Sequence, residues 1–230
     1  MLIFDTSVPP CFFAGNLKGA KFGLLGLNPG LTKDHKKELE LYQKTLKDNK
    51  SVLDDFYGKL FTIFKENDIG IQYYYKFSVL LCGVLNIANI PKPLDRYDLL
   101  QENLVNFDLI PYHSTSFKIG EIQKKHLPIL KPYIETTKEL IQMSSTEYLF
   151  ISGRPWKLLV KEEQDVLDVE TEDEMCFFEG DIWKSFLAHF GVCLGRKFVW
   201  FEKFVTSLRG ITYKDLYYVG EQIADKWGIT

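Results

Sequence analysis

Four short apolar runs along the chain predict buried strands. They cover residues 22–27, 108–110, 148–151 and 198–201, and turn-forming or polar residues follow each of them. Continuous apolar runs of this length are typical of strands that are covered on both faces, although short runs can also belong to buried helices.

The segments between these runs show helical spacing. Apolar residues recur at intervals of three and four after Ser51 and again after Asp95. The first set is Val52, Phe56, Leu60, Ile63 and Phe64, and the second is Leu99, Leu100 and Leu104. Pro128 and Pro132 predict that the stretch 122–143 is either two helices or one kinked helix, because each proline removes a backbone donor.

Strands that alternate with helices indicate right-handed crossovers and a parallel sheet with helices on both faces. We therefore expect a three-layer α/β/α fold with a mostly parallel, four-stranded sheet. A length of 230 residues without repeats, low-complexity tracts or a clear linker predicts one domain over residues 1–230.

The composition is that of a globular protein, with 46% hydrophobic and 26% charged residues, which excludes a disordered chain and a disulfide scaffold. The net charge of −3 comes from one block, residues 161–174, which holds eight acids and one lysine. The rest of the chain is mildly basic. We expect the acidic block to be a solvated loop.

Several classes of protein are excluded. No apolar run reaches the length of a membrane span and the N-terminus lacks a basic leader, so we expect a cytoplasmic protein without membrane contact. The four cysteines, Cys11, Cys82, Cys176 and Cys193, lack the close pairing of a zinc or iron–sulfur site, so we expect buried thiols, no metal and no cofactor.

Polar and turn-forming residues follow all four predicted strands, where open α/β sheets bind their ligands. The first of these loops reads Gly26-Leu27-Asn28-Pro29-Gly30, a tight turn that would present the Asn28 side chain rigidly. The simpler alternative is an ordinary strand-to-helix turn.

This turn resembles the first motif of the uracil-DNA glycosylase superfamily, and it is most similar to the Gly-Ile-Asn-Pro-Gly of its mismatch-specific uracil/thymine branch. The resemblance implies a four-stranded parallel sheet between helices and hydrolysis of the bond between a flipped base and its sugar. It also implies that Asn28 positions the attacking water, while the backbone of the turn, including Gly26, Leu27, Pro29 and Gly30, lines the base pocket.

The second motif of that superfamily, His-Pro-Ser or Asn-Pro-Ser after the last strand, is missing. Residues 205–210 read Val-Thr-Ser-Leu-Arg-Gly instead. The cysteine spacing of the iron–sulfur branches is missing too, so no cluster is carried over. The resemblance therefore rests on one motif and the overall layout.

Residues in the other loops predict the remaining contacts. His113 is expected to be the second catalytic group, with Tyr112 and Ser114 shaping the base pocket. Alternatively, Tyr112 and His113 only hydrogen-bond across their loop. The aromatic residues are expected to lie mostly in the core, with Phe77 or a neighbouring tyrosine as the candidate that stacks on a base.

Four residues are expected to contact nucleic-acid phosphates: Gly153, Arg154, Ser207 and Arg209. A glycine and an arginine before a proline suit an anion-binding corner at a helix start. The alternative for Arg154 is an ion pair with the acidic block that begins at Glu162.

The sequence thus predicts a DNA-binding glycosylase of base-excision repair, whose target is a flipped uracil or a damaged base. A protein that kept the fold and binds nucleic acid or nucleotides without catalysis is the alternative, because the second motif is missing. A small-molecule enzyme or an interaction domain remains a third possibility.

Overall fold

The computed structural model describes residues 10–26, 53–111, 127–153, 168–179, 182–202 and 210–229, together with the single positions 37, 40, 41 and 44. For 53–55, 127, 168–179 and 182–186 it describes the backbone alone.

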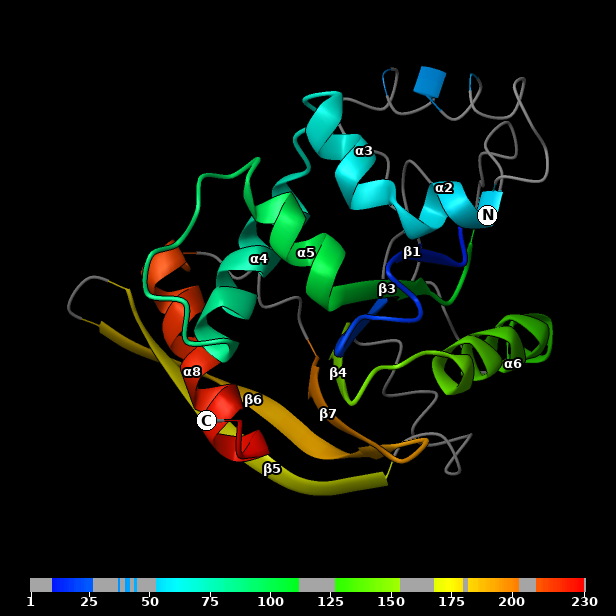
Figure 1. Ribbon diagram of the computed structural model, residues 1–230. Coiled ribbons are helices and arrows are strands. Elements are labelled where there is room, and N and C mark those ends of the chain that lie inside the picture. Colours follow the sequence, from blue (N-terminus) through cyan, green and yellow to red (C-terminus); the bar gives the residue numbers. More distant parts are fainter. Residues whose placement is uncertain are drawn as a thin grey trace.

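One sheet of seven strands forms the centre of the described fold (Figure 1). Its strand order is β1-β3-β2-β4-β7-β6-β5. The strands are β1 (Phe13–Gly15), β2 (Phe22–Gly26), β3 (Leu104–Asp108), β4 (Tyr148–Ser152), β5 (Asp168–Glu179), β6 (Ile182–Cys193) and β7 (Arg196–Phe201). The four strands β3, β2, β4 and β7 run parallel, whereas β1, β6 and β5 pair antiparallel. The α/β class is confirmed, but a four-stranded, mostly parallel sheet is wrong, because antiparallel strands extend the parallel centre on both sides.

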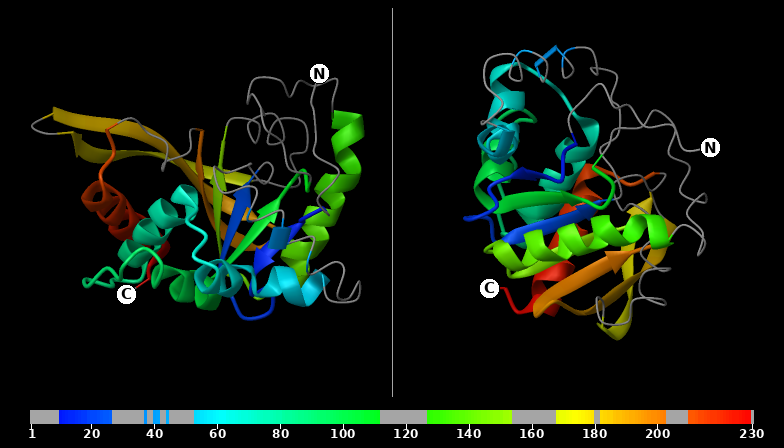
Figure 2. Two further views of the ribbon diagram at one scale, coloured as in Figure 1. Left: turned by 90° about the horizontal axis from the view of Figure 1, so that it is seen from above. Right: turned by 90° about the vertical axis from the view of Figure 1, so that its right-hand side faces the viewer.

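Helices cover both faces of the sheet. They are α2 (Leu53–Gly58), α3 (Leu60–Glu66), α4 (Gln72–Val84), α5 (Arg96–Asn103), α6 (Leu127–Met143) and α8 (Tyr213–Trp227). Figure 2 shows α6 and α8 on opposite sides of the strands. Two separate sets of buried side chains result. One packs α2, α3, α4, α5 and α8 against the sheet, and the other packs α6 against the opposite face.

The register of the parallel strands assigns residues to these two faces. Leu24 in β2 lies opposite Asn106 in β3 and Phe150 in β4. Leu24 and Phe150 belong to the core on the α4 and α8 side, whereas their neighbours Leu25 and Ile151 belong to the core under α6. Because side chains alternate along a strand, Asp108, two positions after Asn106, lies on the α4 side.

The helix predictions are partly correct. The segment after Ser51 forms two short helices, α2 and α3, which are separated at Lys59. The described part of the proline-containing stretch, residues 127–143, forms the single helix α6. Pro128 lies in its first turn, where a missing N–H costs little, and the N–H that Pro132 lacks would have bonded the Pro128 carbonyl.

Two strand predictions are corrected. The predicted strand 108–110 is β3, which ends at Asp108, because the buried polar residues Asn106 and Asp108 interrupt the apolar run that would have revealed it. Residues 168–174 of the acidic block belong to the edge strand β5, so the expected loop is wrong there. Edge strands tolerate charged residues because part of their surface faces water.

Helices α4 and α8 pack closely at two glycines. A Cβ on Gly83 would lie 2.0 Å from the Tyr217 carbonyl oxygen, and one on Gly220 would lie 2.1 Å from the Leu80 carbonyl oxygen. Any side chain at either position would push the two helices apart, so these glycines set how close α8 lies to α4.

Buried thiols are confirmed for Cys11, Cys82 and Cys193, whereas the side chain of Cys176 lies outside the described residues. Burial raises the pKa of the Cys82 thiol to about 11 and that of Cys193 to about 12, so both are neutral at pH 7. Among the described helices, none is long and apolar enough to span a membrane.

Candidate functional site

The ends of four parallel strands meet at one edge of the sheet, here called the carboxyl edge. It consists of Gly26, Asp108, Ser152 and Phe201, the last residues of β2, β3, β4 and β7. Gly26 and Asp108 are register partners, and so are Ser152 and Phe201. Ligands of open α/β sheets bind beyond this kind of edge, so the side chains here are the first candidates for a site.

Asp108 is the most unusual of these residues because it is a buried carboxyl group. It is 5% exposed, and its Oδ2 accepts a hydrogen bond from the Asn106 Nδ2 at 2.8 Å. Burial raises the pKa of Asp108 to about 7, although the Asn106 hydrogen bond acts in the opposite direction. A carboxyl group with a pKa near neutrality can exchange protons with a substrate at physiological pH.

Gly26 makes room for this carboxyl group. A Cβ at position 26 would lie 2.8 Å from the Asp108 Oδ1. Gly26 was predicted to let a ligand approach the backbone of the turn. In the structure, the Asp108 carboxyl group occupies the space that a side chain at position 26 would need, at the end of β2.

Helix α4 covers this part of the sheet with aromatic rings. Tyr73 lies close enough to Asp108 for the carboxylate charge to add to the effect of burial, and both raise the pKa of the Tyr73 phenol. Phe77, one helical turn later, packs edge-on against Phe150 with ring centroids 5.1 Å apart, and it is 3% exposed. Phe77 therefore forms part of the core here, and its predicted stacking on a base stays a prediction.

A second group of side chains lies at the carboxyl edge around the end of β4. Gly153 has a φ of 112°, its N–H donates to the Phe201 carbonyl at 2.9 Å, and its carbonyl accepts from the Trp200 Nε1 at 3.1 Å. His189 in β6 stacks on Trp200 with centroids 4.4 Å apart, and its Nε2 lies 4.0 Å from a Glu202 carboxylate oxygen. These bonds hold Gly153 in a fixed turn directly before Arg154.

Most of the predicted site residues lie outside the described residues. They are Leu27, Asn28, Pro29, Gly30, Tyr112, His113, Ser114, Arg154, Ser207 and Arg209. Their roles stay predictions. Gly26 and Gly153 lie at the ends of β2 and β4 as expected, so the loops that carry Asn28 and Arg154 both start from the carboxyl edge.

Sequence reasoning missed Asp108 as a site residue. The sequence predicts a strand that begins at Asp108 and continues through Leu109 and Ile110, and one carboxylate in such a run does not indicate a site. The available signal was the pair Asn106 and Asp108, two polar residues on one face of a strand that is otherwise apolar.

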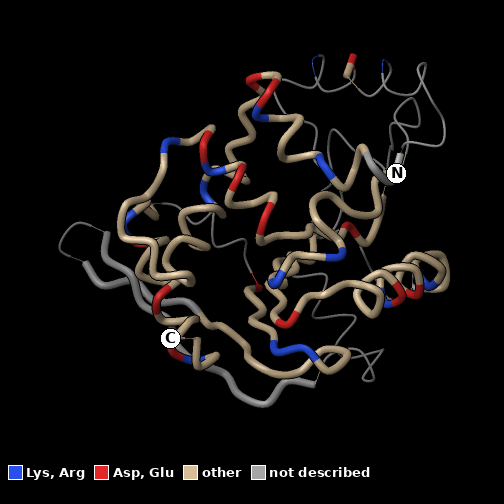
Figure 3. Tube along the Cα trace, viewed as in Figure 1, with Lys and Arg blue, Asp and Glu red and all other residues tan. Residues whose placement is uncertain are grey.

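The described residues contain no group of three or more His, Cys, Asp and Glu side chains that could hold a metal ion. Charges of both signs are interspersed along the described helices, which therefore do not form one uniformly basic face (Figure 3). No protein-family model matches the chain, and no curated protein matches it either.

Proposed function

We propose that the protein is a uracil-DNA glycosylase-like enzyme that hydrolyses the N-glycosidic bond of a flipped uracil or damaged base in DNA. The observation that carries this proposal is the buried Asp108 carboxyl group, which lies beside Gly26 at the carboxyl edge and has a pKa near 7. The resemblance of residues 26–30 to the first motif of that superfamily agrees with it.

The chemistry requires a positioned water, a group that accepts its proton and stabilisation of a positively charged sugar. The Asn28 amide can orient a water but cannot take its proton. Asn28 follows Gly26 by two residues, a chain length of at most about 7 Å. An ionised Asp108 can accept the proton and favours positive charge on the sugar nearby, so the two residues together supply what the amide lacks.

Asp108 also addresses the missing second motif. That motif supplies a group that contacts the base in the superfamily, and residues 205–210 do not contain it. After it has accepted the proton of the water, Asp108 can donate a hydrogen bond to an oxygen of the departing base. The loop that carries Arg154 starts at Gly153, and we expect Arg154 to contact a phosphate.

The test is release of free base from oligonucleotides that contain a single uracil, either opposite guanine or in single-stranded DNA. We expect release by the wild-type protein, a loss of at least about 100-fold for Asp108→Asn, and a similar loss for Asn28→Ala. The exposed Asp225→Asn serves as the matched control and should leave the rate unchanged.

Two outcomes would argue against the proposal. Binding of DNA without release of any base would favour the non-catalytic alternative, in which the fold is kept for nucleic-acid binding. Equal rates for the wild type and Asp108→Asn would show that this carboxyl group plays no part in the reaction.

A further inference from the structure

Arg96, the first residue of α5, is a buried arginine enclosed by aromatic rings. Its side chain is 1% exposed. The guanidinium carbon lies 5.9 Å from the centroid of the Tyr75 ring and 5.2 Å from that of the Tyr213 ring. Tyr75 belongs to α4 and Tyr213 begins α8, so three helices meet around this cation.

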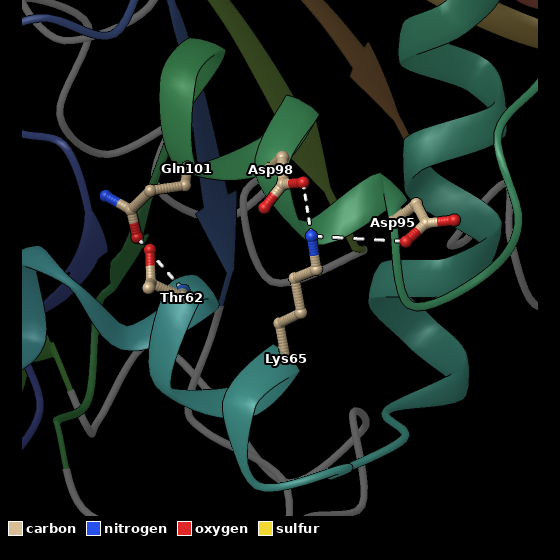
Figure 4. Close-up of polar contacts among 5 residues, drawn as sticks. All are labelled: Thr62, Lys65, Asp95, Asp98 and Gln101. Atoms are coloured by element: carbon tan, nitrogen blue, oxygen red, sulfur yellow. Dashed lines mark hydrogen bonds and ion pairs between the residues drawn. The ribbon is translucent and has the colours of Figure 1, made fainter.

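None of the described residues accepts a hydrogen bond from the guanidinium of Arg96. Its Nε is buried and has no hydrogen-bond partner, and no residue in the described ranges forms a hydrogen bond or ion pair with the side chain. The aspartates on either side in the sequence do not fill this role. Figure 4 shows Asp95 and Asp98 both directed at Lys65 of α3, which hydrogen-bonds Asp98 and lies 4.0 Å from Asp95.

Cys82 does not balance the charge either. The positive charge of Arg96 acts on the Cys82 thiol, but burial dominates and raises its pKa to about 11. The thiol is therefore neutral at pH 7. Tyrosine rings attract a cation through their faces, yet they accept none of the in-plane N–H bonds of the guanidinium.

Arg196 shows what a structural arginine looks like in the same protein. Its guanidinium donates to the carbonyls of Leu194 at 2.6 Å, Ile141 at 3.0 Å and Thr146 at 3.3 Å. Each of its three nitrogens therefore has an acceptor, and Nη2 joins β7 to the end of α6. The donors of Arg96 have no such use, although burying an unpaired guanidinium is costly.

We propose that Arg96, between the rings of Tyr75 and Tyr213, is a binding site for a phosphate group. A guanidinium offers parallel N–H donors that match two phosphate oxygens, and aromatic ring faces do not accept these bonds as an anion can. The site uses neither Gly26 nor Asp108, and it does not depend on base release.

Of the two rings beside Arg96, that of Tyr213 belongs to the more exposed residue. It is 42% exposed, whereas the arginine behind it is covered. The other end of α8, at Trp227, packs against Phe22 and Tyr148, the first residues of β2 and β4. Tyr213 therefore lies at the end of α8 that is farther from the start of the sheet, four residues after Arg209 in the sequence. In the proposed site, a phosphate group reaches Arg96 from the side of Tyr213.

The test compares thermal unfolding in sodium phosphate, sodium acetate and sodium chloride at equal ionic strength and pH 7. At a phosphate concentration ten times the dissociation constant, we expect the Tm of the wild type to rise by about 3–6 °C relative to chloride. Arg96→Met should lose this rise and keep a basal Tm at least as high as that of the wild type, since it removes an unpaired buried charge. Arg196→Lys is the matched control and should keep the rise.

Two further arms identify the source of the phosphate group. If the site binds the DNA backbone, the slope of log K against log salt for single-stranded DNA should fall by about 0.7 in Arg96→Met. If it binds only free phosphate or a mononucleotide, that slope stays unchanged while the Tm rise is lost. An equal Tm rise in Arg96→Met and the wild type would overturn the proposal, and so would an equal response to acetate. If Arg96→Met does not fold, Tyr213→Ala answers the question, because it should weaken phosphate binding several-fold.

Discussion

The Asp108 carboxyl group occupies the space that a side chain at Gly26 would need, because a Cβ at that position would lie only 2.8 Å from its Oδ1. The two residues are register partners at the ends of β2 and β3. The glycine and the buried acid therefore form one unit, in which the identity of either residue depends on the other.

Gly26→Ala should destabilise the protein by about 1–3 kcal/mol, because the added methyl group displaces the carboxyl group or separates β2 from β3. Chemical denaturation of the variant measures this loss. In an Asp108→Ala background the same substitution should cost far less, since its clash partner is gone. An equal cost in both backgrounds would show that the two side chains do not compete for space.

Asp108 should make the protein less stable as the pH rises from 4 to 7. Its pKa is about 7 in the folded protein and near the ordinary value of 3.8 in the unfolded chain. Between these values the unfolded chain releases the proton while the folded protein retains it, so ionisation favours unfolding. A difference of about three pKa units corresponds to about 4 kcal/mol in the free energy of unfolding. This contribution is present below pH 4 and is lost once the pH exceeds 7.

Asp108→Asn removes this titration and keeps an oxygen that can accept the bond from Asn106. We expect the variant to be about 1–3 kcal/mol more stable than the wild type at pH 8 and no more stable at pH 4. Urea denaturation at both pH values checks this. A gain in stability together with a loss of base release is the behaviour of a residue that is kept for function. A variant that is less stable at pH 8 would show that the ionised carboxylate is well compensated.

The sequence predicted the centre of the fold better than its margins. Apolar runs revealed β2, β4 and β7, because strands covered on both faces are apolar throughout. In β5, six of the twelve residues are Asp or Glu, and a run of acids looks like a solvated loop. Pairing with β6 outweighs the low strand propensity of these residues, and no local pattern reveals that partner.

In the candidate site, too, some positions follow from local sequence patterns and others do not. The loop positions after β2 and β4 follow from alternating strands and helices, so Gly26 and Gly153 could be placed at the carboxyl edge in advance. Asp108 and Arg96 could not be recognised. The chemistry of Asp108 comes from its burial, and that of Arg96 comes from burial of an Nε that has no hydrogen-bond partner among the described residues. Burial depends on how distant segments pack.

Gly220→Ala should destabilise the protein by about 2–4 kcal/mol, although alanine is the better helix former. The new methyl group would lie 2.1 Å from the Leu80 carbonyl oxygen, which belongs to the backbone of α4 and cannot move alone. Thermal unfolding measures the effect. Gly58→Ala is the matched control, because a Cβ there meets nothing within 4 Å, and it should be neutral or slightly stabilising.

Arg196→Met should cost about 2–4 kcal/mol, because the guanidinium satisfies the Ile141 carbonyl near the end of α6 and the Thr146 carbonyl before β4. The methionine fills a similar volume but cannot donate to either carbonyl, and the Ile141 carbonyl then keeps only its bonds from the Ser144 N–H and hydroxyl. Arg96→Met makes the same chemical change at a side chain that has no acceptor among the described residues, and in chloride it should leave the Tm unchanged or raise it. Unfolding curves of both variants in one buffer give the comparison. If Arg96→Met is as damaging as Arg196→Met, the Arg96 guanidinium is a structural element in its own right and not a cation that awaits an anion.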